Sequence, residues 1–325
     1  MDEFRPSPME RALRRLRAVR EWFAPLSVPR DRLTPECSGQ AASDGIRALL
    51  AGGAPCMVAR MGSGELEVTL RRFERLDPAG AVTKAVRYVA GETGPWWWDA
   101  RVAHGMQQGA GLFPVTPETL ARFADRMLAD LREVDVLGAW LDGEARLRPL
   151  LRGARIAKLA DLEPYYHRDP WSAALAGRTV MVVHPFAESI RRQYERREHL
   201  FADPRVLPAF DLKTMPAVQS IAGSRTEHRD WFAALDFMCN RLSAERFDVA
   251  IIGAGAYGFP LAAHVKRMGR QAVHLGGPTQ ILFGIRGKRW DEMPFFAALA
   301  NEYWVRPSAG ETPTGHAAIE GGCYW

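Results

Sequence analysis

Residues 247–258 read FDVAIIGAGAYG, a buried-strand pattern that runs directly into the glycine-rich sequence G-x-G-x-x-G. A helix pattern follows over residues 259–268. In this order the glycines permit a tight turn, and the free N–H groups at the helix start attract phosphate. The stretch therefore predicts a strand–turn–helix unit that binds a phosphate or a nucleotide through Gly253, Gly255, Tyr257 and Gly258. Ordinary tight packing of the helix on the strand is the alternative.

The same turn also argues against one cofactor. Nicotinamide dinucleotide sites place an Asp or Glu about 20 residues beyond the glycines, where it binds the ribose. Here the next strand pattern ends in His274, Leu275, Gly276 and Gly277, with no acidic residue. We therefore expect no NAD.

Strand and helix patterns alternate on the N-terminal side of this unit. Strand patterns cover residues 54–60, 135–140, 179–184, 206–212, 247–252 and 271–275. Helix patterns cover residues 45–50, 66–75, 82–90, 117–133, 187–198, 227–243 and 259–268. Such alternation is typical of right-handed βαβ units. It predicts an α/β fold with a Rossmann-like, doubly wound and mostly parallel sheet flanked by helices.

The chain divides into three parts on this pattern. Residues 1–44 are expected to form a basic amphipathic helix and a linker, the linker covering residues 31–44. Residues 45–176 form a first α/β half, and residues 177–325 form a second half that carries the G-x-G-x-x-G turn and a C-terminal segment.

The expected N-terminal helix, residues 9–23, has apolar residues at spacings of three and four, with arginines between them. Docking on the chain's own surface or on a partner protein is the favoured interpretation, and binding to a membrane surface is the alternative. No apolar run typical of a secretory signal precedes it. The expected location is therefore the cytoplasm, with peripheral contact to the inner membrane face if the helix binds lipid.

Composition sets the broad class. The 325 residues are 47% hydrophobic and 25% charged, as in folded proteins, and the net charge of +5 favours anionic partners. The longest uncharged apolar stretch, residues 249–263, is interrupted by glycines and a proline and is shorter than the ~20 residues that span a bilayer. The four cysteines are scattered, which argues against a zinc or disulfide framework. No nucleic-acid-binding module is recognisable, so we expect no nucleic acid partner.

A second candidate site lies where the strand pattern 54–60 ends. The turn there reads Arg60-Met61-Gly62-Ser63-Gly64-Glu65 and leads into a helix pattern. Ligands of α/β proteins bind at the carboxyl ends of strands, and carboxylates such as Glu65 are ligands for Mg²⁺ or Mn²⁺. The alternative for a glutamate at a helix start is a favourable interaction with the helix dipole.

Three further sets of residues are candidates, each with an alternative. Gln280, Arg286 and Lys288 follow the glycines at 276–277 and could neutralise a diphosphate, or they form a solvated basic loop. His184 closes a strand pattern as a proton carrier, a phosphate contact or a core histidine. Asp99 follows three tryptophans that either stack on a sugar or are buried.

The turn at residues 60–65 resembles the R-x-G-D-G-E turn of the bacterial GT-D (DUF1792-like) glycosyltransferases, whose fold is Rossmann-like. The late glycine motif and Gly111-Leu112-Phe113-Pro114 are more loosely similar. The resemblance implies transfer of a sugar from a nucleotide-diphosphate donor to an acceptor in polysaccharide or glycoconjugate assembly. In the family a D-x-E pair holds a divalent metal, but Ser63 stands at the aspartate position here.

On this resemblance we expect a glycosyltransferase whose partners are a nucleotide-sugar donor and a glycan acceptor. The residues expected to act in catalysis are Glu65, Asp99 and His184, with Glu65 also a ligand for Mn²⁺ or Mg²⁺. The residues expected to bind the nucleotide or diphosphate are Arg60, Gly62, Gly253, Gly255, Tyr257, Gly258, Gln280, Arg286 and Lys288. Two alternatives stay open: a Rossmann enzyme that uses NAD or S-adenosylmethionine, and an inactive nucleotide-sugar-binding scaffold.

Overall fold

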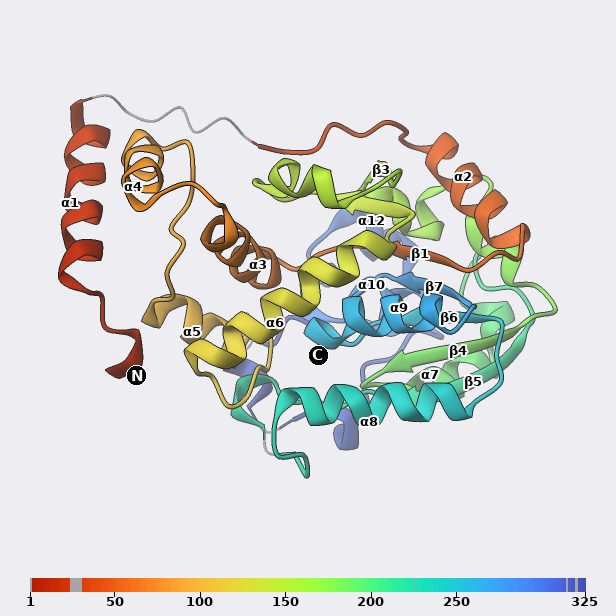
Figure 1. The fold of residues 1–325 in the computed structure, drawn as a ribbon. Coiled ribbons are helices and arrows are strands. Elements are labelled where there is room, and N and C mark those ends of the chain that lie inside the picture. Colours follow the sequence, from red (N-terminus) through yellow and green to blue (C-terminus); the bar gives the residue numbers. More distant parts are fainter. Residues whose placement is uncertain (1, 24–30, 225, 314, 319–320) are drawn as a thin grey trace.

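The computed structural model describes residues 2–23, 31–224, 226–313, 315–318 and 321–325. Its centre is one seven-stranded sheet, in which every neighbouring pair of strands is parallel, with the order β3-β2-β1-β7-β6-β4-β5 (Figure 1). The strands are β1 Cys56–Ala59, β2 Val136–Ala139, β3 Arg155–Lys158, β4 Thr179–His184, β5 Asp211–Pro216, β6 Val249–Ile252 and β7 Gln271–His274. The predicted α/β fold with a Rossmann-like, doubly wound sheet is confirmed.

Both faces of the sheet are covered, which explains why β1 and β6 are apolar at every position and every residue of β7 is buried. Side chains along a strand point alternately to opposite faces, so each strand feeds two cores. In β4, Met181 and Val183 belong to one core while Val180 and Val182 belong to the other.

Helices contribute to the two cores on opposite sides of the sheet. One core contains side chains of α3 Ser63–Leu76, α5 Ala100–Gln108, α6 Pro117–Asp130, α8 Trp231–Ala244 and α9 Gly258–Arg267. The other contains side chains of α2 Gln40–Ala51, α7 Ala187–Tyr194, α10 Pro278–Leu282, α11 Lys288–Asp291 and α12 Pro294–Leu299. Figure 1 shows α6, α8 and α9 together in front of the sheet.

Two helices lie outside this layered body. α1 Pro8–Phe23 packs beside α4 Ala81–Ala90 at the end of the molecule away from α2 (Figure 1). A small separate core of Leu13, Tyr88 and Trp97 joins them. None of the described helices is long and apolar enough to cross a membrane.

The connections fix where ligands can bind. After β4 the chain continues outward to the edge strand β5, whereas after β6 it continues inward to β7. Because β4 and β6 are neighbours, their connections diverge at the carboxyl ends of the strands. This is the topological switch point at which doubly wound proteins bind ligands.

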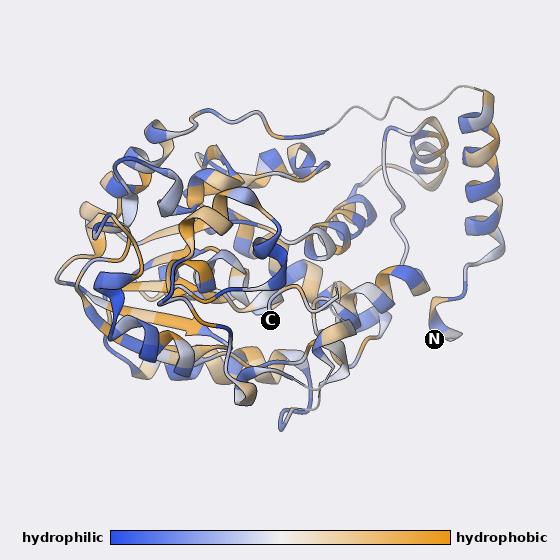
Figure 2. Cartoon of the chain, turned by 180° about the vertical axis from the view of Figure 1, so that it is seen from behind, coloured by the Kyte–Doolittle hydropathy of each residue, from blue (hydrophilic) through white to orange (hydrophobic). Residues whose placement is uncertain are grey.

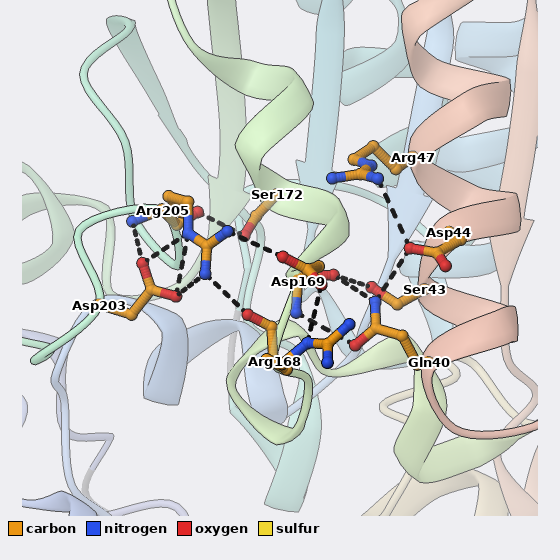
Figure 3. Close-up of polar contacts among 9 residues, drawn as sticks. All are labelled: Gln40, Ser43, Asp44, Arg47, Arg168, Asp169, Ser172, Asp203 and Arg205. Atoms are coloured by element: carbon orange, nitrogen blue, oxygen red, sulfur yellow. Dashed lines mark hydrogen bonds and ion pairs between the residues drawn. The ribbon is translucent and has the colours of Figure 1, made fainter.

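A network of polar contacts joins α2 to two segments that are far from it in the sequence (Figure 3). The Asp169 carbonyl accepts hydrogen bonds from Gln40 and Ser43 of α2, at 2.8 and 2.9 Å. The Asp169 carboxylate pairs with Arg205 at 2.9 Å, and Arg205 also binds Asp203. The network therefore anchors α2 to the segment between β3 and β4 and to the connection before β5.

Several elements differ from the sequence prediction: β3 and α5 were not predicted, and two other elements have different bounds. α2 begins at Gln40, inside the stretch 31–44 that was expected to be a linker. The small residues there resemble a linker, but tertiary hydrogen bonds to Asp169 hold the first helical turn. The fifth strand is Asp211–Pro216 rather than residues 206–212. The apolar residues of 206–210 fill the core from a loop, while the edge strand itself is only partly buried.

Candidate functional site

Arg60 lies at the carboxyl end of β1 and is the centre of the candidate site. Its guanidinium carbon is 5.0 Å from the centroid of the Trp140 ring, and burial lowers the pKa of the guanidinium. Within the described part of the chain it donates no hydrogen bond and forms no ion pair. A largely buried guanidinium with unused donors is suited to bidentate binding of a phosphate or carboxylate.

The turn after Arg60 brings Glu65 beside it. Gly62 is the N-cap of α3, and the Glu65 carboxylate folds back over it into the space that a Cβ of Gly62 would occupy. The Glu65 carboxylate acts on the Arg60 guanidinium electrostatically. Ser63 is exposed at the first position of α3. The two predicted site residues Arg60 and Glu65 are thus brought together.

Two buried glutamates face the same guanidinium. Burial raises the pKa of Glu144 and of Glu163 to about 7, although Arg60 opposes the shift in both. Glu144 accepts hydrogen bonds from the backbone N–H groups of Trp140 and Leu141 at 2.9 and 3.1 Å. Its other oxygen has no partner among the described residues. The charge around Arg60 therefore changes near neutral pH.

The glycine motif meets this site across β7. A Cβ on Gly276 would lie 3.5 Å from Cδ of Arg60, so this glycine leaves room for the arginine. A Cβ on Gly253 would lie 2.6 Å from the Gly276 carbonyl oxygen, 2.5 Å from His184 Cδ2 and 2.7 Å from Thr279 Oγ1. The ends of β1, β7, β6 and β4 thus form one continuous row of close contacts.

The three glycines of the motif have different structural roles. Gly253 and Gly258 sit against protein atoms, and a Cβ on Gly258 would overlap the His274 ring. Gly255 is exposed, has a φ of +52°, and has open space where its Cβ would be. Close packing therefore explains the first and third glycines, and only Gly255 faces space that a ligand could use.

His184 and His274 are both buried within this row. Burial lowers the pKa of each to about 3, so both rings are neutral at physiological pH. Nδ1 of His184 accepts a hydrogen bond from the Phe186 N–H at 2.9 Å. A neutral, backbone-bonded ring can donate a hydrogen bond from Nε2, but it adds no positive charge to the site.

Two other predicted binding residues are buried and used in protein contacts. Tyr257 stacks on Trp231 with a centroid distance of 4.7 Å, and its hydroxyl pairs with Ser220 at 2.9 Å. Gln280 is completely buried, and its side-chain amide donates to the carbonyls of Ile285 and Tyr324.

The residues near the C-terminal end of the chain cover part of the carboxyl edge. The Tyr324 ring sits where a Cβ of Gly277 would point, and the Trp325 carbonyl accepts from the Lys288 N–H at 3.2 Å. Lys288 is exposed, while Arg286 pairs with Asp291 at 3.1 Å. Lys288 and Arg286, which were predicted to bind a diphosphate, therefore lie in the segment that contacts the C-terminal residues.

Asp99 belongs to a different contact network. It is the N-cap of α5, where it accepts from the Val102 N–H, and it pairs with Arg71 and Arg14 at 3.0 Å each. Burial alone raises its pKa, but these contacts outweigh it and lower the pKa overall. Among the preceding tryptophans, Trp97 and Trp98 are buried.

The described residues do not offer a ready metal site. They contain no group of three or more His, Cys, Asp or Glu side chains placed to hold a metal ion. Glu65 stands in the turn without the acidic partner of a D-x-E pair, because residue 63 is serine. These residues therefore do not fit the divalent metal that a D-x-E pair would hold.

A pocket of about 390 Å³ opens beside the carboxyl ends of β4 and β5. Glu188, Gln219 and Glu311 contribute polar side chains to its wall. Its volume is within the ~300–1,000 Å³ usual for small-molecule sites.

Sequence reasoning did not find Glu144, Glu163 or Trp140 as partners of Arg60. Each lies in a loop after β2 or β3, and only the parallel order of β1, β2 and β3 brings those loops to Arg60. For Trp140 and Glu144 the available signal was their position at and just after the predicted strand 135–140, whereas Glu163 follows β3, which was not predicted. The whole chain was also compared with protein-family models, with curated proteins and with solved structures. None of these three comparisons found a match.

Proposed function

We propose that this protein is a glycosyltransferase that uses a nucleoside-diphosphate sugar and acts on a polysaccharide or glycoconjugate acceptor. The observation that carries the proposal is the Arg60 guanidinium, which lies at the carboxyl edge with its donors unused by the described residues. The resemblance of the turn at residues 60–65 to the GT-D turn supports the same assignment.

In this proposal Arg60 binds the diphosphate of the donor. Negative charge grows on the departing diphosphate as the glycosidic bond breaks, and preorganised donors stabilise it most effectively where water is excluded. The Trp140 ring fixes the guanidinium from one side. Arg60 thereby supplies positive charge that a D-x-E metal site supplies in the resembled family.

Glu65 would take the proton from the acceptor hydroxyl, because it is the half-buried carboxylate next to Arg60. Two other acids fit this role less well: Asp99 is held by its helix cap and ion pairs, and Glu67 pairs with Arg71 at 2.7 Å.

The first experiment measures thermal stability with UDP, GDP, CMP, UDP-glucose, NAD and S-adenosylmethionine, each with and without Mn²⁺. A ligand at 100 times its dissociation constant adds about 2.7 kcal/mol to the free energy of unfolding. We expect stabilisation by a nucleoside diphosphate in the wild type and its loss in Arg60→Gln. The matched control is Arg47→Gln, since Arg47 is a half-exposed arginine of α2 that lies outside the site.

Turnover is then followed as release of nucleoside diphosphate in the presence of glycan acceptors, with Glu65→Gln as the inactive variant. Diphosphate binding without turnover in the wild type would support the scaffold instead. Stabilisation by NAD or S-adenosylmethionine alone would overturn the proposal in favour of another Rossmann enzyme.

A further inference from the structure

The face of α1 that points away from α4 is apolar and exposed. Met9, Leu16, Val19 and Phe23 are 53%, 56%, 55% and 75% exposed, and Trp22 beside them is 79% exposed. With Ala12, which is also exposed, the residues 9, 12, 16, 19 and 23 repeat at alternating spacings of three and four. At this spacing they form one stripe along the helix, which we call the α1 stripe.

The exposure is not a sign of an undocked helix, because the opposite face of α1 is firmly held. Leu13 is buried against Tyr88 and Trp97. Arg17 donates to the carbonyls of Tyr88 and Thr93 at 3.3 and 3.1 Å, and Arg14 pairs with Asp99 at 3.0 Å. The α1 stripe is therefore presented outward by a helix that is fixed in place.

Apolar exposure is concentrated at this end of the molecule. Of the thirteen large apolar side chains exposed in the described chain, seven lie on α1 and α4. On α4 these are Val82 and Val86, one helical turn apart and 78% and 63% exposed. Figures 1 and 2 show α1 and α4 side by side at one end of the molecule. In Figure 2, hydrophobic and hydrophilic colours alternate along α1. Large exposed apolar patches mark interaction sites, and the α1 stripe is the longest run of exposed apolar residues at this end.

The charges beside the α1 stripe have one sign. At 100° per residue, Arg15 lies beside one edge of the stripe and Arg20 beside the other, with Arg11 further round the helix on the side of Arg15. The two glutamates of α1 point away from the stripe: Glu10 is bonded to Ser7, and Glu21 pairs with Arg17. Within the described residues Arg15 forms no hydrogen bond or ion pair.

We propose that the α1 stripe binds the surface of an anionic lipid bilayer. Helices that lie in the interface combine a wide apolar face, aromatic residues and flanking arginines, and their affinity rises with anionic lipid. A second copy of this chain is a poorer occupant, because pairing two stripes would bring rows of arginines of like charge together. The proposal is independent of the sugar-transfer proposal.

The test is co-sedimentation of the full chain with vesicles of phosphatidylcholine alone and of phosphatidylcholine mixed with phosphatidylglycerol. We expect binding to the mixed vesicles that weakens with salt, and little binding to the neutral ones. The apolar variant is Leu16→Ser with Phe23→Ser, and the charge variant is Arg11→Gln with Arg15→Gln. Each pair should weaken binding about tenfold or more.

Phe237→Ser is the matched control, because Phe237 is an exposed aromatic residue of α8 that lies outside the stripe. It should bind vesicles as the wild type does. Circular dichroism and the unfolding midpoint show whether each variant is folded. Absence of binding to both vesicle types, or unchanged binding by the folded apolar variant, would overturn the proposal. A dimer in light scattering that Leu16→Ser dissociates would assign the stripe to a second copy instead.

Discussion

Replacing Glu144 by glutamine tests the electrostatics around Arg60 directly. Glu144 is 1% exposed, and burial raises its pKa from 4.5 to about 7. An acid whose pKa is higher in the folded state holds a proton that the unfolded state has already lost. The wild type therefore gains stability from this group at low pH and loses that gain as the pH rises through 7.

Glutamine stays neutral at every pH and can still accept from the backbone N–H groups of Trp140 and Leu141. The free energy of unfolding of Glu144→Gln relative to the wild type should therefore rise with pH. Linkage between the two pKa values gives an increase of about 2.5 kcal/mol from pH 5 to pH 8. Nearly all of the increase should fall below pH 7.5.

The assay is urea denaturation at several pH values between 5 and 8. Glu302→Gln is the control, because Glu302 is exposed, and its curve should follow that of the wild type. Parallel pH profiles for Glu144→Gln and the wild type would refute the reasoning. They would mean that the buried carboxylate is ionised throughout and balanced by Arg60. If the reasoning holds, anion binding at Arg60 should strengthen as the pH falls below 7.

Other substitutions test separate parts of the structure. Gly258→Ala should destabilise the fold by about 3 kcal/mol because its methyl group would overlap the His274 ring, while Gly255→Ala should lose only about 1 kcal/mol to its positive φ; equal losses in urea denaturation would contradict this difference. Asp99→Asn should keep the helix cap but lose about 1–3 kcal/mol from the broken ion pair with a buried arginine, and an unchanged unfolding midpoint would argue against that pair. The folded-state pKa of His184 is about 3, so only the unfolded state gains a proton as the pH falls below 6.5 and the wild type loses stability; His184→Gln should therefore gain about 1 kcal/mol relative to it between pH 6 and pH 5, and unfolding curves that shift equally with pH would refute this.

Most of the fold could be predicted from the sequence because the pattern was consistent over many elements. β4 was predicted with its observed bounds, residues 179–184. A β-branched run that is followed directly by a helix pattern is compatible with few alternatives to a strand. α6 was predicted from residue 117, and it begins there, capped by Thr116 and with Pro117 in its first turn. Failures came where tertiary contacts outweigh local pattern, as at the start of α2 and at the edge strand β5.

The candidate site was predictable only in part. The turns at 60–65 and 253–258 each lie at a strand end, and the parallel sheet brings them to one edge. Local pattern could not show that Gly258 leaves room for the His274 ring, or that Tyr257 stacks on Trp231 inside the core. Nor could it show that loops after β2 and β3 place Glu144 and Glu163 near Arg60, because those contacts depend on strand order.

The strand order also has a consequence for how the protein is made. β7 lies between β1 and β6, so it is the only strand that joins β1–β3 to β4–β6 in the described sheet. A ribosome has translated more than 270 residues before this central strand exists. Until then the nascent chain holds two separate three-stranded sheets, each with an open apolar edge where β7 will insert. Those two edges are where a chaperone would be needed, and where pairing between different nascent chains would begin.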